Sequence, residues 1–152
     1  REVGRLFAYV GVVAAVVQGG LIGPATRRWG EARVVVLGLC GLVIGFAAMP
    51  LAQNMTVLLV ATALLAGGFG LCNPALNSLI SRRASSESQG AALGVAQSGA
   101  SLARILGPAF AGAVFSTWGR HAPYMIGAVL LLFAIWIAWR MVRASESTKF
   151  PS

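Results

Sequence analysis

The residues best suited to chemistry lie in an apolar run from residue 91 to 117. Gln97, Ser101 and Arg104 occur there at positions i, i+4 and i+7, and Ser98 stands beside them. In a helix this spacing places all three on one face. A guanidinium in the middle of a membrane helix costs about 2.5 to 3.5 kcal/mol on insertion scales, so Arg104 needs water, an anion or an acceptor group. We expect this face to handle a substrate or a coupling ion. The alternative is that Arg104 binds backbone carbonyls and staples two helices together.

Three amides form a second set of polar candidates. Asn73 and Asn77 share one helical face at i and i+4, and Gln18 lies near the centre of an earlier apolar run. Pro74, between the two asparagines, removes one backbone hydrogen bond and favours a kink. We expect the amides either to contact substrate or to form hydrogen bonds between helices, worth under about 1 kcal/mol per pair.

The sequence contains none of the common motifs of covalent or metal-dependent catalysis. H-E-x-x-H, G-x-S-x-G and the Walker loop do not occur, and metal-ligating residues are not clustered. Cys40 and Cys72 lie far apart in apolar stretches, which is typical of small buried hydrophobic residues. We therefore expect no enzymatic reaction, no metal and no cofactor.

The composition places these residues in a membrane. Hydrophobic residues make up 57% of the chain and charged residues 11%, and the mean hydropathy is +0.78. These values leave too few charges to cover the surface of a soluble domain. The net charge of +8 does not indicate nucleic-acid binding, because the basic residues cluster between apolar runs instead of along one helix face.

Five apolar runs are long enough to cross a bilayer, which takes about 20 helical residues. They cover approximately Leu6 to Thr26, Val34 to Ala52, Val57 to Ser81, Ala91 to Thr117 and Pro123 to Val142. Because the connections are short, neighbouring helices must run antiparallel. The prediction is an all-α membrane protein, with a five-helix transmembrane bundle over residues 1–143 and a tail over residues 144–152.

Lys and Arg are distributed unevenly between the two ends of these helices. Alternate connections carry eight on one side, at positions 27, 28, 33, 82, 83, 140, 143 and 149, and three on the other, at positions 1, 5 and 120. By the positive-inside rule, loops 27–33 and 82–90 and the C-terminus are cytoplasmic, in a multi-pass protein of the inner (plasma) membrane. The N-terminus is then outside without a signal sequence or an initial Met, so we expect upstream helices.

Polarity divides the five runs into two groups. The first, third and fourth runs carry nearly all the polar residues, and the second and fifth carry almost none. Because polar groups avoid lipid, we expect the first group to line a cavity and the second to face lipid. Gly107, Pro108 and Gly112 form a small-residue, kinked face in the fourth run, which we expect to serve helix packing.

Several motifs, taken together, resemble the C-terminal half of the major facilitator superfamily, in its drug/proton antiporter-like branch. The stretch from Gly23 to Glu31 is similar to a second copy of the family's cytoplasmic loop signature G-x-x-x-D-R-x-G-R-R, and Gly23, Arg28 and Gly30 match it. Arg27 stands where the signature has Asp, and Glu31 where it has a basic residue. Similarity continues through Gly67-Gly68-Phe69-Gly70, Asn73-Pro74, Arg82-Arg83, Gln89-Gly90, Gly94, Ser98, Arg104 to Pro108, and Gly112.

The resemblance implies that the five runs are helices 8 to 12 of a twelve-helix transporter. Its partners would be membrane lipid, a small-molecule substrate and the missing N-terminal helices of the same transporter, with no nucleic acid. The implied function is proton-coupled efflux of small amphipathic molecules or drugs by alternating access. Two alternatives stay open: a solute uptake transporter of the same fold, and a non-transporting membrane scaffold or sensor.

Overall fold

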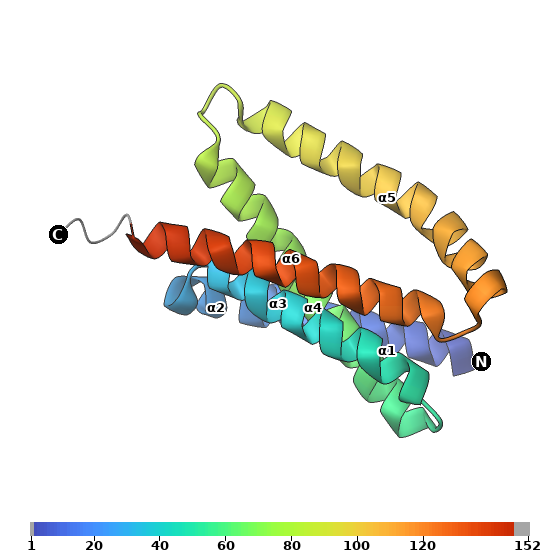
Figure 1. Ribbon diagram of the computed structural model, residues 1–152. Coiled ribbons are helices and arrows are strands. Elements are labelled where there is room, and N and C mark those ends of the chain that lie inside the picture. The colour runs from blue at the N-terminus through green and yellow to red at the C-terminus, as the bar shows by residue number, and fades with distance from the viewer. Residues whose placement is uncertain (1, 148–152) are drawn as a thin grey trace.

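The computed structural model describes residues 2–147 as a chain of helices joined by short connections (Figure 1). The elements are α1 (Glu2–Val16), the π-helical turn η1 (Val17–Leu21), α2 (Ile22–Trp29), α3 (Glu31–Ala48), the 3₁₀ turn η2 (Met49–Leu51), α4 (Met55–Arg83), α5 (Gln89–Trp118) and α6 (Ala122–Ser147). Five segments are long and apolar enough to cross a membrane: Gly4–Trp29, Glu31–Leu51, Met55–Arg83, Gln89–Trp118 and Ala122–Arg140. The predicted all-α membrane fold with five spanning helices is confirmed.

The connections at the Arg-rich ends are shorter than expected. Only Gly30, with a φ of 81°, separates α2 from α3, so most of the expected loop 27–33 is helical. The expected loop 82–90 shrinks to residues 84–88. Arg is a good helix former and is favourable in a last helical turn, so a helix can continue past the apolar run. Helix α6 also continues past residue 143, to Ser147, and residues 148–152 of the expected tail lie outside the described residues.

We expected one regular helix over Leu6 to Thr26, but the first apolar run is interrupted. The interruption is η1, which contains Gln18 and the pair Gly19-Gly20. Glycine weakens the α-helix because it gains no side-chain packing and loses more backbone entropy. Such π-helical turns within α-helices are frequent at functional sites.

Glycines allow α3 and α4 to pack with their backbones in close contact. A Cβ atom added to Gly38 would lie 2.7 Å from the carbonyl oxygen of Gly68, and one added to Gly68 would lie 2.6 Å from that of Gly38. About two turns further along α3, a Cβ on Gly45 would lie 2.8 Å from the side chain of Leu65. Small residues at helix contacts let membrane helices approach in this way.

The core of the described chain is centred on α3, which lies between α4 and α6 (Figure 1). Val34, Val35 and Leu39 of α3 and Ala75 of α4 are buried together, and apolar residues of α6 pack against them. We expected the second run to be peripheral and to face lipid, but one side of α3 is buried against α4 and α6; its other side, with Leu37 and Ile44, is exposed in the described chain. A helix that is apolar all round gives no signal of which face is buried.

Helix α5 is attached to the rest of the chain near its two ends and bends away between them (Figure 1). At its start, the side-chain nitrogen Nε2 of Gln89 donates a hydrogen bond to the Ser81 carbonyl over 2.9 Å. Near its end, Phe115 lines a cavity of about 390 Å³ together with Phe46 and Tyr124. Every residue from 101 to 110 is exposed. The middle of α5 is therefore the least packed span of the described chain.

Candidate functional site

The polar face predicted on α5 lies on this least packed span. Gln97, Ser98, Ser101 and Arg104 are all exposed and all belong to one uninterrupted helix, so the predicted i, i+4, i+7 register holds. Within residues 2–147, Arg104 makes no hydrogen bond and no ion pair. A charged group in a membrane span needs an acceptor or water. The structure thus leaves this guanidinium available to a group from outside the described chain.

The amides of α4 and η1 are brought to neighbouring positions. A Cβ on Gly70 of α4 would lie 3.2 Å from the Val17 side chain and 3.6 Å from the Gln18 side chain, so η1 packs directly against α4. Gln18 therefore lies about one helical turn from Asn73, and two from Asn77, along α4. All three amides are exposed. No hydrogen bond joins them to the polar residues of α5 within the described part of the chain.

The residues of the loop signature surround the sharp turn between α2 and α3. Gly23 and Arg28 lie within α2, and Gly30 is the turn itself. The Gly30 amide donates to the Thr26 carbonyl over 2.9 Å, which closes the end of α2. A positive φ of 81° is costly for residues with a side chain, so the signature requires glycine at this position.

An ion pair that the sequence analysis missed joins α3 to α4. Glu31, the first residue of α3, accepts from Nε of Arg82 at 3.0 Å and from the Ser78 hydroxyl at 3.3 Å, both through Oε1. The Glu31 side chain is 18% exposed and the Arg82 side chain 72% exposed. Glu31 also stands in the first turn of a helix, where the helix dipole favours an acid. The only hint in the sequence was that Glu31 is an acid at a position where the loop signature has a basic residue.

The prolines and glycines that we expected to kink or pack the helices all lie inside helices, but not all of them have a packing partner. Pro74 lies within α4 next to the buried Ala75, and Pro108 lies within α5. A Cβ added to Gly107 or Gly112 would meet nothing within 4 Å. Their expected packing role therefore stays a prediction, because no described residue provides the partner.

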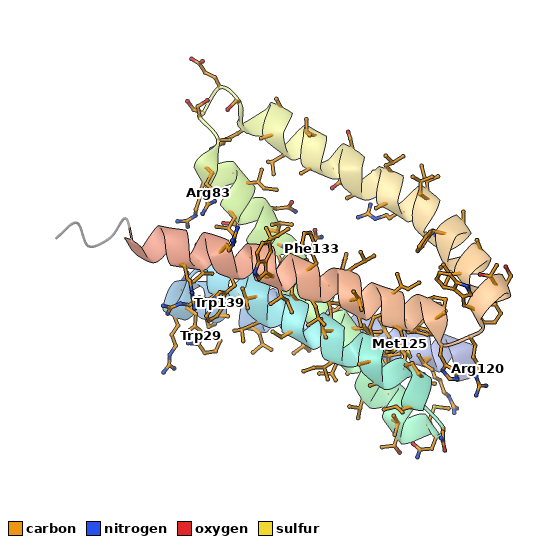
Figure 2. All side chains as sticks on the ribbon, viewed as in Figure 1. Trp29, Arg83, Arg120, Met125, Phe133 and Trp139 are labelled. Carbon is orange, nitrogen blue, oxygen red and sulfur yellow. The ribbon has the colours of Figure 1, made fainter. Side chains whose placement is uncertain are left out.

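Basic residues and tryptophans gather at one end of the bundle. Figure 2 shows Arg83, Trp29 and Trp139 at this end and Arg120 at the opposite end. Arg140 lies over the ring of Trp136, with Cζ 4.2 Å from the ring centroid. Across residues 2–147, no group of three or more His, Cys, Asp or Glu residues is placed to hold a metal ion.

Comparison with protein families decides the relationship. The family model for the Major Facilitator Superfamily matches residues 1–152. The chain belongs to this superfamily. No solved structure matches the chain.

Several proteins similar to this chain are resistance proteins by name. The chain is 31% identical over 137 residues to "Tetracycline resistance protein, class C" of Escherichia coli, covering 88% of this chain and 34% of the relative. It is 33% identical over 138 residues to the class G protein of Vibrio anguillarum, with the same coverage of 88% and 34%. It is 29% identical over 136 residues to "Multidrug resistance protein 2" of Bacillus subtilis, covering 89% of this chain and 33% of the relative. The chain thus spans about a third of the length of these superfamily members.

Proposed function

We propose that this chain is part of a proton-coupled efflux transporter that moves small amphipathic molecules across the plasma membrane by alternating access. In this proposal the polar faces of α5, α4 and η1 line the transport pathway. Its residues are Gln97, Ser101 and Arg104 of α5, Asn73 and Asn77 of α4, and Gln18 of η1. Secondary transporters commonly bind substrate near the bilayer midplane between structural repeats.

The observation that carries the proposal is the exposed Arg104 on a weakly packed membrane helix. Retaining a guanidinium there costs a few kcal/mol, and no described residue accepts its hydrogen bonds. A structural staple would be expected to have its carbonyl acceptors among the neighbouring helices. An arginine facing a pathway instead finds water or an anion. The names of the tetracycline and multidrug resistance relatives support efflux as the direction.

Water access to α5 separates this proposal from a scaffold or sensor. Single cysteines would replace Gln97, Ser101 and Arg104 in a background where Cys40 and Cys72 are changed to alanine. We expect a membrane-impermeant thiol reagent to label all three, and a matched cysteine at Leu132, an exposed apolar position on α6, to stay unlabelled. A lack of labelling on α5 in the folded protein would favour the scaffold. Drug efflux driven by an imposed pH gradient in proteoliposomes then separates export from solute uptake.

We further propose that the Arg-rich end of the bundle is cytoplasmic, which places the turn at residues 27–33, the connection at 82–90 and the C-terminus inside the cell. The basis is the eight-to-three distribution of Lys and Arg. Reporter fusions at residues 30 and 86 should be active as cytoplasmic fusions, and those at residues 54 and 120 as periplasmic fusions. Periplasmic activity at residue 30 or 86 would reject this orientation.

A further inference from the structure

A cavity of about 280 Å³ lies between α3, α4 and α6. Its lining on α4 begins at Cys72, near the middle of that helix, and ends at Arg83 in the last turn. These eleven residues of helix correspond to about 16 Å. Arg83 lies at the Arg-rich end of the bundle (Figure 2). None of the proposed pathway residues lines this cavity.

The walls of the cavity are apolar from the Cys72 end up to Arg83. Val35 and Leu39 of α3 belong to the buried core, and Ala134 and Ala138 of α6 pack against that core. An apolar cavity offers water no hydrogen-bond partners, so it stays dry and takes up apolar ligands instead. The walls therefore suit an alkyl chain that runs between α4 and α6.

Arg83 gives one end of the cavity a positive charge. Within residues 2–147, Arg83 makes no hydrogen bond and no ion pair, and no carboxylate lines the cavity. The acid that starts α3, Glu31, is engaged by Arg82 and the Ser78 hydroxyl. A planar guanidinium can donate two parallel hydrogen bonds to a carboxylate. The cavity thus combines an apolar body with one available cation at its end.

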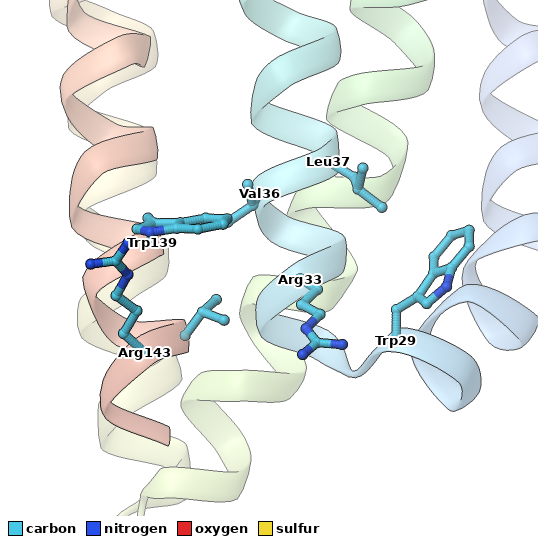
Figure 3. A pocket seen from close by; sticks show the side chains of 7 residues that line it. Trp29, Arg33, Val36, Leu37, Trp139 and Arg143 are labelled. Atoms are coloured by element: carbon cyan, nitrogen blue, oxygen red, sulfur yellow. The ribbon is translucent and has the colours of Figure 1, made fainter. Parts of the chain in front are cut away.

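A larger groove on another face of α3 differs in this respect (Figure 3). It has a volume of about 600 Å³ and shares no lining residue with the cavity. Arg33, which lines that groove, already has an interaction partner. An anion that binds there has to compete with this partner. At Arg83 no described residue provides such competition.

We propose that the cavity between α3, α4 and α6 binds a single-chain amphiphile with an anionic head, of the kind represented by a medium-chain carboxylate. The alkyl chain lies against Val35 and Leu39, and the head group binds Arg83. Ligand pockets usually measure about 300 to 1,000 Å³, so this cavity is small and favours one chain over the two chains of a phospholipid. Binding needs only the folded bundle, so this proposal is independent of the transport proposal.

The test measures equilibrium binding of radiolabelled decanoate to the whole protein that carries this sequence. The protein is placed in phosphatidylcholine nanodiscs at a mildly alkaline pH, where the carboxylate is ionised, and empty nanodiscs give the background. Unlabelled decanoate, decanol and decyltrimethylammonium then compete for the site, because they share the alkyl chain and differ in the charge of the head. We expect decanoate to compete about tenfold better than decanol, the scale of one charge-assisted contact, and decyltrimethylammonium to compete least.

Two variants with matched controls locate the site. Arg83→Gln should abolish the preference for decanoate over decanol, whereas Arg27→Gln, in the last turn of α2 and outside the cavity, should keep it. Ile137→Trp should fill the cavity from α6 and weaken binding of both ligands, whereas Leu132→Trp, also on α6 but outside the cavity, should not. Ile137 and Leu132 are 43% and 54% exposed, so the fold should accept both exchanges.

Four results would overturn the proposal. Equal competition by the three ligands would show that the charge of the head is not recognised. An unchanged preference in Arg83→Gln would place the anion elsewhere. Competition by phosphatidylglycerol as effective as that by decanoate would make the cavity a phospholipid site. Decanoate binding no higher than in empty nanodiscs would show that another part of the protein fills the cavity.

Discussion

The contact between α3 and α4 and the middle of α5 use glycine in opposite surroundings. Gly38 and Gly68 each face the other's carbonyl oxygen so closely that neither position has room for a Cβ. Gly99 of α5 faces nothing within 4 Å. All three helices are glycine-rich apolar spans in the sequence. The abundance of glycine alone therefore does not reveal which membrane helices are closely packed.

The two regions differ in where their polar side chains lie. The buried side of α3 is entirely apolar, whereas the exposed middle of α5 carries Gln97, Ser101 and Arg104. Close packing stabilises α3. Polar side chains on an unpacked face of α5 would raise the free energy of the helix in lipid, and no packing contact offsets that cost. We propose that α3 and the side of α4 that packs against it form the scaffold, and that α5 carries most of the functional surface.

The largest effect on stability is expected at the glycine contact. Gly38→Ala or Gly68→Ala places a Cβ against backbone atoms, so the helices must separate, and overpacking of this kind costs about 1 to 3 kcal/mol. The matched variant Gly99→Ala meets no atom and gains helix propensity of up to about 1 kcal/mol. Thermal unfolding in detergent should therefore rank Gly99→Ala at or above the wild type and the other two below it. A destabilised Gly99→Ala would mean that α5 is packed as closely as α3.

A smaller effect is expected at the ion pair between α3 and α4. Glu31→Gln should lower the free energy of unfolding by about 1 kcal/mol, because Arg82 is largely exposed and solvent screens the pair. A double-mutant cycle with Arg82→Gln isolates the pairwise energy, and added salt should reduce it.

Exchanging the two charges sharpens this prediction. Glu31→Arg with Arg82→Glu restores an ion pair, but it places a base at the start of α3 and an acid at the end of α4. Both positions are unfavourable for the helix dipoles, so the exchange should recover only part of the lost stability. Full recovery would show that the dipoles contribute nothing here.

The helices themselves were predictable from the sequence, because length and apolar composition suffice to define a membrane span. The register of Gln97, Ser101 and Arg104 was predictable too, since it depends only on helical periodicity. The central place of α3 was not, because its uniformly apolar sequence has no distinct buried face. The pair between Glu31 and Arg82 was missed because it joins residues far apart in sequence. The π-helical turn at Gln18 was not predicted either: Gly19-Gly20 weaken the helix there, but glycine alone does not distinguish a π-helical turn from a continuous α-helix.

The smallest effect on stability, and the most informative effect on transport, is expected at Arg104. Arg104→Ala removes a group that makes no hydrogen bond or ion pair to any described residue, so the melting temperature should stay close to that of the wild type. Arg104→Lys keeps a positive charge but loses the planar fork of donors. If Arg104 faces the pathway, both variants should be folded and defective in transport. A staple between helices would instead lose stability in both, through unpaired acceptors.

The most direct test is therefore the rate of drug transport in proteoliposomes, per folded molecule, for wild type and Arg104→Ala. The measurement requires the whole protein that carries this sequence, with an imposed pH gradient. We predict that transport by Arg104→Ala falls at least about tenfold while its melting temperature is unchanged, which corresponds to about 1.4 kcal/mol of lost stabilisation. Transport at the wild-type rate by Arg104→Ala would contradict the assignment of α5 as the pathway helix.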